Sequence, residues 1–133
     1  MLSARDRRRL ARVVHRAERR TGLQIAVYVG PVEDDPGAHA ERLLGEAGAA
    51  GLPAVLVLVA PEIKRIEIRT APAARDRIPD TAAAQAVAVM APVLADGRLV
   101  AGVSAGLDVL VAAAGPTPKG SAGGPELPDV LTP

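Results

Sequence analysis

The sequence predicts a small α/β domain in which a mixed β-sheet has helices on both faces, a three-layer α/β/α sandwich. Two observations support this fold class. Apolar residues with helical spacing alternate along the chain with short segments typical of strands. One of these segments, residues 54–60 (AVLVLVA), is apolar at every position, which is typical of a strand that is covered on both faces.

The first helix is expected to begin after Ser3, whose hydroxyl can cap it, and to end before Gly22. One apolar face of this helix is formed at positions i, i+3, i+4 and i+7 by Leu10, Val13, Val14 and Ala17. A strand is expected over residues 23–29. Its odd-numbered residues should lie on one face of the sheet and its even-numbered residues, including Tyr28, on the other.

The second helix is expected to start at Asp35-Pro36, because Asp is a good N-cap residue and Pro fits the first helical position. After the apolar strand 54–60, residues 66–70 (IEIRT) alternate in polarity, as expected for the return strand of a hairpin. This order predicts that the first two strands are parallel and joined by a helical crossover. The third strand should run antiparallel to the second.

A third helix is expected from Asp80, and Pro92 should kink or split it. A last helix is expected over residues 99–114. From Gly115 onward, nine of nineteen residues are Gly or Pro, which predicts disorder. The chain is therefore divided into an α/β domain, residues 1–114, and a disordered Pro/Gly-rich C-terminal tail, residues 115–133.

Composition excludes several kinds of chemistry. The chain has no cysteine, which excludes disulfides, thiolate metal sites and cysteine nucleophiles. The N-terminus reaches charged residues at Arg5 and Asp6 without an apolar h-region, so no signal peptide is expected and the protein is predicted to be cytoplasmic. Tyr28 is the only residue among Phe, Trp and Tyr, so stacking of nucleic-acid bases on aromatic side chains has no platform.

Three stretches together resemble the TPM-domain superfamily, which includes thylakoid-lumen phosphatases. They are the opening helix with Thr21-Gly22-Leu23, the strand, acidic turn and return strand of residues 54–68, and the helix pair around Asp96-Gly97. Residues 25–30 with Asp35-Pro36 are closest to an actinobacterial branch of unknown function, and the Ala- and Arg-rich composition is typical of high-GC genomes. The resemblance covers residues 2–114 and implies a TPM-like α/β/α fold.

Two departures from the TPM pattern bear on activity. Residues 51–53 (GLP) stand where enzymatic members carry an Asp-Asn-Gly-like turn, and residues 71–73 (APA) stand where they carry a Gly-Tyr-Gly-like segment. Both departures remove polar or flexible groups that could hold a phosphate or a cation. The phosphatase activity of the superfamily is therefore not expected to carry over.

Four carboxylates form the first candidate site. If the first two strands are parallel, their carboxyl ends share one edge of the sheet, where open α/β sheets place ligands. This acidic rim, which could hold a divalent cation, consists of Glu33, Asp34, Asp35 and Glu62. The alternative is that Asp35 caps the second helix and that the others are solvated turn residues.

The second candidate site follows from uneven charge. Residues 1–20 contain eight arginines against Asp6 and Glu18, a net charge of +6, while the rest of the chain carries −5. One sector of the first helix, opposite Leu10 and Val14 and roughly 20 Å long, holds the arginine row: Arg5, Arg8, Arg12, Arg16 and Arg19. It is interpreted either as a surface for an anionic partner (nucleic acid, lipid headgroups or an acidic protein) or as a solvated face. Nucleic-acid binding would depend on phosphates and lack sequence specificity.

The remaining polar candidates suggest no catalytic residues. His15 and His39 lack further ligands at metal spacing and are expected at the surface, while Tyr28 is expected in the core with its hydroxyl at the rim. Gly102 and Gly106 are expected to allow close helix packing rather than to mark a transmembrane segment. The leading interpretation is a non-catalytic interaction module that uses its basic first helix and needs no cofactor. The alternative is a metal-dependent, phosphatase-like enzyme with a cation at the acidic rim.

Overall fold

The computed structural model describes residues 2–32, 34–117 and 130–131, apart from the side chains of residues 46–49. In chain order its elements are α1 (Ala4–Thr21), β1 (Gln24–Val29), α2 (Pro36–Ala49), β2 (Ala54–Ala60), the 3₁₀ turn η1 (Pro61–Ile63), β3 (Arg65–Thr70), the 3₁₀ turn η2 (Pro72–Ala74), α3 (Asp80–Ala95), α4 (Leu99–Ala114) and β4 (Val130–Leu131). The predicted helices and all three predicted strands are present, with bounds that differ by at most one or two residues.

The strands form one mixed sheet in the order β3-β2-β1-β4. β1 and β2 are parallel over the whole of β1, so that Val27 lies opposite Val57. β2 and β3 are antiparallel, so that Val57 also lies opposite Ile68. The predicted parallel pair and the predicted antiparallel hairpin are both confirmed.

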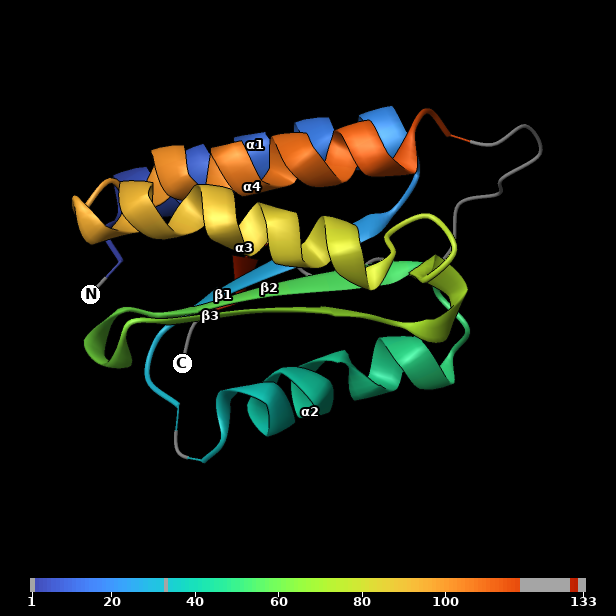
Figure 1. The fold of residues 1–133 in the computed structure, drawn as a ribbon, viewed down its shortest axis with the longest axis horizontal. Helices are drawn as coiled ribbons and strands as arrows, with labels where there is room; N and C mark the ends of the chain where they lie inside the picture. The colour runs from blue at the N-terminus through green and yellow to red at the C-terminus, as the bar shows by residue number, and fades with distance from the viewer. Residues whose placement is uncertain (1, 33, 118–129, 132–133) are drawn as a thin grey trace.

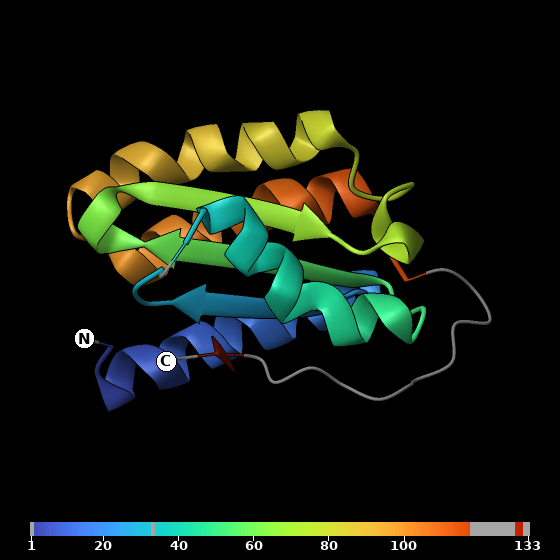
Figure 2. The ribbon, with the colours of Figure 1, turned by 90° about the horizontal axis from the view of Figure 1, so that it is seen from below.

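The short strand β4 was not predicted from the sequence. Val130 lies opposite Val27 and Leu131 opposite Tyr28, in parallel, so β4 adds to the edge of the sheet beyond β1. Figure 2 shows β4 beside β1, next to α1. These two residues belong to the segment predicted to be disordered, whereas residues 118–129 and 132–133 of that segment lie outside the described residues.

Three layers are visible in Figure 1, with α1, α3 and α4 on one face of the sheet and α2 on the other. The larger core contains the odd-numbered residues of β1 and β2, packed against Leu10 and Val14 of α1 and Leu107 and Leu110 of α4. The smaller core contains the even-numbered residues and Leu44 of α2. The α/β/α fold class is thus confirmed. No helix of the described part of the chain is both long and apolar enough to cross a membrane.

The local signals act at the element ends as expected. The Ser3 hydroxyl accepts a hydrogen bond from the Asp6 amide at 3.0 Å and caps α1. Gly22 follows α1 in the left-handed region, with φ 74°, and its amide donates to the Glu18 carbonyl at 2.7 Å. The Asp35 carboxylate accepts from the Ala38 amide at 3.0 Å and caps α2.

The pairing of α3 with α4 tests two predictions. A split of the third helix at Pro92 is wrong, because α3 runs through this residue. Pro92 and Ala88 are both exposed, so the Ala88 carbonyl that lacks its helical partner can bond to water. Close packing at the α4 glycines is confirmed. A β-carbon on Gly102 would lie 2.6 Å from Leu94 Cδ2, and one on Gly106 would lie within 2.5 Å of Met90.

Candidate functional site

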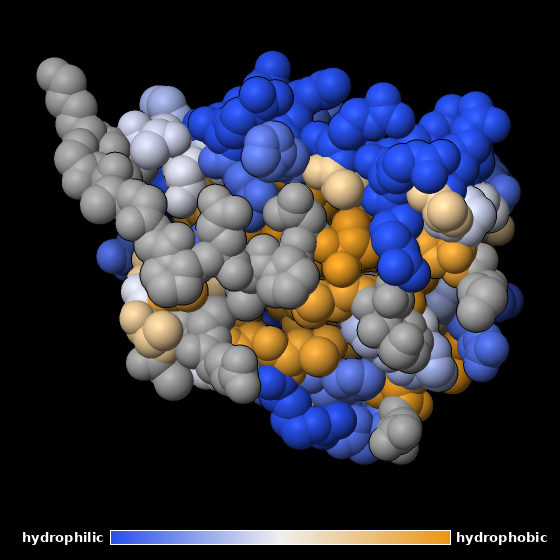
Figure 3. All heavy atoms as spheres, turned by 180° about the vertical axis from the view of Figure 1, so that it is seen from behind, coloured by the Kyte–Doolittle hydropathy of each residue, from blue (hydrophilic) through white to orange (hydrophobic). Residues whose placement is uncertain are grey.

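The arginine row lies on the side of α1 that faces away from the sheet. The side of α1 that packs on the sheet carries Leu10, Val14 and Ala17, all buried. Every residue of the row is exposed: Arg5, Arg8, Arg12, Arg16 and Arg19. Figure 3 shows the hydrophilic side chains of α1 gathered along one border of the molecule, above an apolar area. Helical spacing alone therefore predicted the exposure of the row correctly.

Among the described residues, the row differs from Arg42, Arg65 and Arg69 in having no carboxylate partner. Among the described residues, no arginine of the row forms an ion pair. Elsewhere, Arg65 contacts Glu67 at 3.0 Å, and Arg69 lies 3.6 Å from Glu41 and 3.4 Å from Glu67. Positive charge is therefore compensated locally on β3, whereas the arginine row has no carboxylate partner among the described residues.

Glu18, in the last turn of α1, does not form an ion pair with the row. Glu18 is turned toward the sheet, where its Oε2 accepts a hydrogen bond from the Ile25 amide of β1 at 3.0 Å. Its Oε1 lies 4.0 Å from His15 Nδ1, and only 17% of its side chain is exposed. The role of Glu18 is to bond an amide at the sheet edge.

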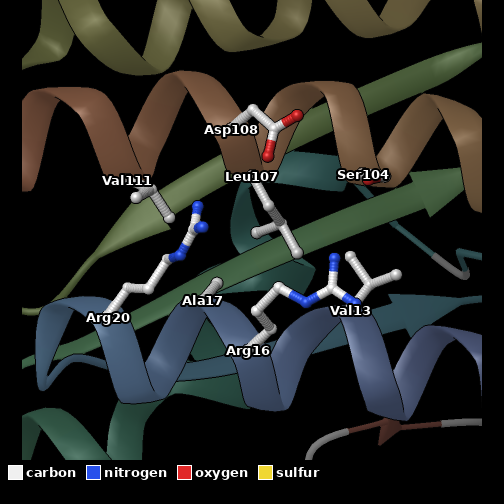
Figure 4. Close-up of a pocket in the computed structure, with 8 residues that line it drawn as sticks. All are labelled: Val13, Arg16, Ala17, Arg20, Ser104, Leu107, Asp108 and Val111. Atoms are coloured by element: carbon white, nitrogen blue, oxygen red, sulfur yellow. The ribbon is translucent and has the colours of Figure 1, made fainter.

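A shallow pocket lies along the line where α1 meets α4 (Figure 4). Arg16 and Arg20 extend over it from α1, and Asp108 lies on its α4 side. The other lining residues are Val13, Ala17, Ser104, Leu107 and Val111. The charged residues of this pocket are two arginines and one aspartate, and the pocket shares Arg16 with the arginine row.

The described carboxylates of the acidic rim each have a different environment. Two bonds from the Arg42 guanidinium, one of them 3.2 Å long, hold Asp34 and lower the pKa of its carboxyl group. Asp35 caps α2, and Glu62 is exposed on η1. Glu33 lies outside the described residues. Within the described residues, no three His, Asp or Glu side chains are grouped as metal ligands require.

The environment of the rim is more ordered than the sequence indicated. Tyr28 is 5% exposed, and its hydroxyl donates to the Pro31 carbonyl at 2.6 Å, as predicted for a core residue with its hydroxyl at the rim. The prediction of a surface histidine is confirmed for His15 but wrong for His39. The His39 ring is half-buried with its centroid 4.9 Å from that of Tyr28, and its Nδ1 has no hydrogen-bond partner in the described part of the chain.

Sequence reasoning missed Arg77, whose guanidinium bonds the ends of two helices. Nη1 donates to the Thr21 carbonyl at the end of α1, 2.6 Å away, and Nε and Nη2 donate to the Ala114 carbonyl at the end of α4. Nη2 also lies 3.0 Å from the carbonyl oxygens of Gly115 and Pro116. No sequence signal identifies such a residue, because its acceptors are backbone atoms 37 to 56 positions away.

Comparison with known proteins supports the fold and defines the family. The BA42 protein from the psychrophilic bacterium Bizionia argentinensis has a TM-score of 0.82 at 20% identity, over 100% of this chain and 96% of that one. The N-terminal domain of a protein from P. gingivalis has a TM-score of 0.68 at 17% identity, over 84% of this chain and 76% of that one. At such identities the likeness shows the fold alone.

No curated protein matches the chain. The family model described as a domain of unknown function (DUF5130) matches residues 2–111, and the chain therefore belongs to this family.

Proposed function

We propose that this domain is a non-catalytic interaction module that binds a polyanionic partner through the arginine row of α1. The supporting observation is a line of five exposed arginines on one helix, none with a carboxylate partner among the described residues. Such a line attracts an anionic surface and gains free energy when bound counterions are released.

Two physical arguments favour binding over a merely solvated face. Like charges at positions i and i+4 destabilise a helix by roughly 0.2–0.5 kcal/mol per pair, and Arg8, Arg12 and Arg16 form two such pairs. A bound polyanion removes this repulsion. The exposed side of α1 also lacks large apolar side chains, which favours electrostatic contact over insertion into a bilayer.

The test is binding of the full chain to heparin, duplex DNA and anionic vesicles as a function of salt. If the five arginines neutralise five phosphates of duplex DNA, affinity should fall by about 500-fold between 50 and 200 mM salt. Arg8→Glu with Arg12→Glu should abolish binding at about 50 mM salt without loss of fold, because both side chains are exposed.

The matched control is Arg75→Glu with Arg98→Glu. Both residues are exposed and lie outside α1, and this variant has the same net charge as the α1 variant. It should bind nearly as well as wild type. Equal weakening by the two variants would assign the effect to net charge. Absence of wild-type binding to any of the three polyanions at about 50 mM salt would show that the row is a solvated face.

The competing proposal is a phosphatase-like enzyme with a divalent cation at the acidic rim. It requires Glu33, Asp34, Asp35 and Glu62 to bind one cation together. In the structure, Asp34 is bonded to Arg42, Asp35 caps α2, and Glu62 is exposed. The test is hydrolysis of a generic phosphomonoester with Mg²⁺, Mn²⁺ or Ca²⁺. Turnover that is lost in the variant with Ala at Glu33, Asp34 and Glu62 would make the enzyme the leading proposal.

We also propose, from the sequence resemblance, that the domain is of the TPM type, that it belongs to an actinobacterial branch, and that it acts in the cytoplasm. The resembling stretches correspond to α1 with β1, to the β2–β3 hairpin, and to the junction of α3 with α4. Fractionation of cells that express the tagged full chain tests the location, with recovery in a secreted or membrane pool as the contrary result.

A further inference from the structure

The edge of β1 that faces away from β2 has a defined set of backbone groups. Gln24 and Gly30 donate their amides to Pro53 and Val59 on the β2 side, at 3.0 and 3.1 Å. In a parallel pair, alternate residues of a strand direct their backbone groups to opposite edges. The amides of the odd-numbered residues Ile25, Val27 and Val29 therefore point to the outer edge, and the bond from the Ile25 amide to Glu18 confirms this direction.

This outer edge is covered differently from the rest of the sheet. Glu18 bonds the Ile25 amide, so it closes the edge at the start of β1. The next residues, Val27 and Tyr28, pair with β4, which has two residues where β1 and β3 have six and β2 has seven. Within the described residues, β4 pairs with only part of β1, and beyond Glu18 the outer edge has backbone groups that can pair with a strand.

The packing positions of the two β4 side chains indicate which side chains this edge accepts. Val130 packs against the larger core, which α1, α3 and α4 cover, and Leu131 packs against the smaller core, which α2 covers. Both residues are half-buried. Two consecutive aliphatic side chains therefore enter opposite faces of the sheet, as the alternation of an extended strand requires.

We propose that the outer edge of β1 is a strand-accepting site for an extended peptide with two consecutive aliphatic side chains, and that Val130–Leu131 is its internal occupant. Backbone pairing at Val27 would supply affinity, and the two aliphatic seats would supply selectivity, as in other cases of strand addition. Glu18 fixes where pairing begins. This site goes beyond the proposed polyanion binding, because it uses backbone and aliphatic groups rather than the arginine row.

An internal occupant of two residues is suited to displacement. The few pairing groups of its two described residues imply little intrinsic affinity, so its advantage over an external peptide is its attachment to the same chain. Attachment by a short linker gives an effective concentration on the order of 1 mM. If the tethered segment has an intrinsic dissociation constant on the order of 0.1 mM, an external peptide would bind the occupied edge about tenfold more weakly than the vacated edge.

The first test is amide hydrogen exchange in the full chain, wild type against Val130→Asp with Leu131→Asp. The variant changes only β4, so the remainder of the fold should persist. The Val27 amide should exchange severalfold faster in the variant, while those of Ala26 and Tyr28, which face β2, should be unchanged. Equal exchange rates of the Val27 amide in wild type and variant would overturn the proposal that Val130–Leu131 occupies the edge. Protection at Val27 that rises with protein concentration would also overturn it, in favour of a second copy.

The second test adds a peptide to both chains and follows the Val27 amide by NMR. The probe is a neutral version of residues 125–133, PQLPNVLTP, with Glu126 and Asp129 changed to their amides. It should bind the variant about tenfold more tightly than wild type. A peptide with Asp at both aliphatic positions should not bind. A peptide in which the backbone amides of the two aliphatic residues are methylated should not bind either. Equal binding of the probe to both chains, or no change at Val27, would overturn the proposal.

Salt separates this proposal from the previous one. Binding of the neutral probe should be nearly independent of salt, whereas binding of a polyanion to the arginine row should weaken steeply. Arg8→Glu with Arg12→Glu should leave probe binding intact. Loss of probe binding in that variant would assign the peptide to the arginine row and overturn the edge site.

Discussion

Replacement of Arg77 should destabilise the domain strongly, although this residue lies in the loop between η2 and α3 and is only half-buried. Its guanidinium bonds the final carbonyls of α1 and α4, where each helix has unsatisfied acceptors and partial negative charge. A fork of several donors can bond both helix ends at once. Arg77 thus fastens together two helices that are neighbours in the same layer.

The magnitude follows from the acceptors. A hydrogen bond to a charged group contributes about 1.5–3 kcal/mol. The bond to Thr21 counts nearly in full, because Thr21 is 0% exposed, whereas the carbonyls after α4 can be hydrated in part when the side chain is removed. Arg77→Ala should therefore cost about 3 kcal/mol of unfolding free energy. For a domain of this size that is a fall in Tm of about 10 °C.

Thermal denaturation followed by circular dichroism provides the measurement, with Arg75→Ala as the matched control. Arg75 is exposed, lies two positions away, and takes part in the described contacts through its backbone amide alone. Arg77→Lys should fall between the two, because one ammonium group cannot reach both helix ends. If Arg77→Ala melts within ~2 °C of Arg75→Ala, the guanidinium bonds contribute nothing to stability and the reasoning is refuted.

Two further substitutions test the core and the contact between helices. Val57→Asp should abolish the cooperative thermal transition, because Val57 is 1% exposed and burial of an unpaired charge costs several kcal/mol of a total of about 5–15; a normal melting curve would contradict the central position of β2. Gly106→Ala should lower unfolding free energy by about 1 kcal/mol in urea titration, because its β-carbon would displace Met90. Gly45→Ala, where a β-carbon would meet nothing within 4 Å, should instead raise the unfolding free energy by about 0.5–1 kcal/mol. If both variants changed the unfolding free energy in the same direction, the packing argument would be refuted.

Most of the fold could be predicted because its signals are local. Ser3, Gly22 and Asp35 each act on a backbone group within four residues, and each does so in the structure. The all-apolar character of residues 54–60 correctly indicated cover on both faces. The strand Val130–Leu131 has no such signal, because its pairing depends on an available edge of β1 rather than on its own periodicity.

The candidate site was predictable to the same extent. Exposure of the arginine row follows from helical geometry and the opposite apolar face alone. The burial of His39 depends on Tyr28, which the fold brings from β1 beside α2. The bond between Arg42 and Asp34 depends on how the start of α2 lies against the preceding loop, and it occupies a carboxylate that the sequence left available to a cation.

The sheet is covered by three helices on one face and by α2 alone on the other, and this asymmetry sets an order in which the molecule opens. The resistance of an element to local unfolding grows with the apolar area that it buries. Because α2 packs on the smaller core, it is the layer least stabilised against local unfolding. Sub-global opening should therefore release α2 first, while the opposite layer stays folded. That partly open form presents Leu56 and Leu58 of β2 to solvent. The face under α2 is thus where proteases and aggregation would first reach an otherwise native molecule.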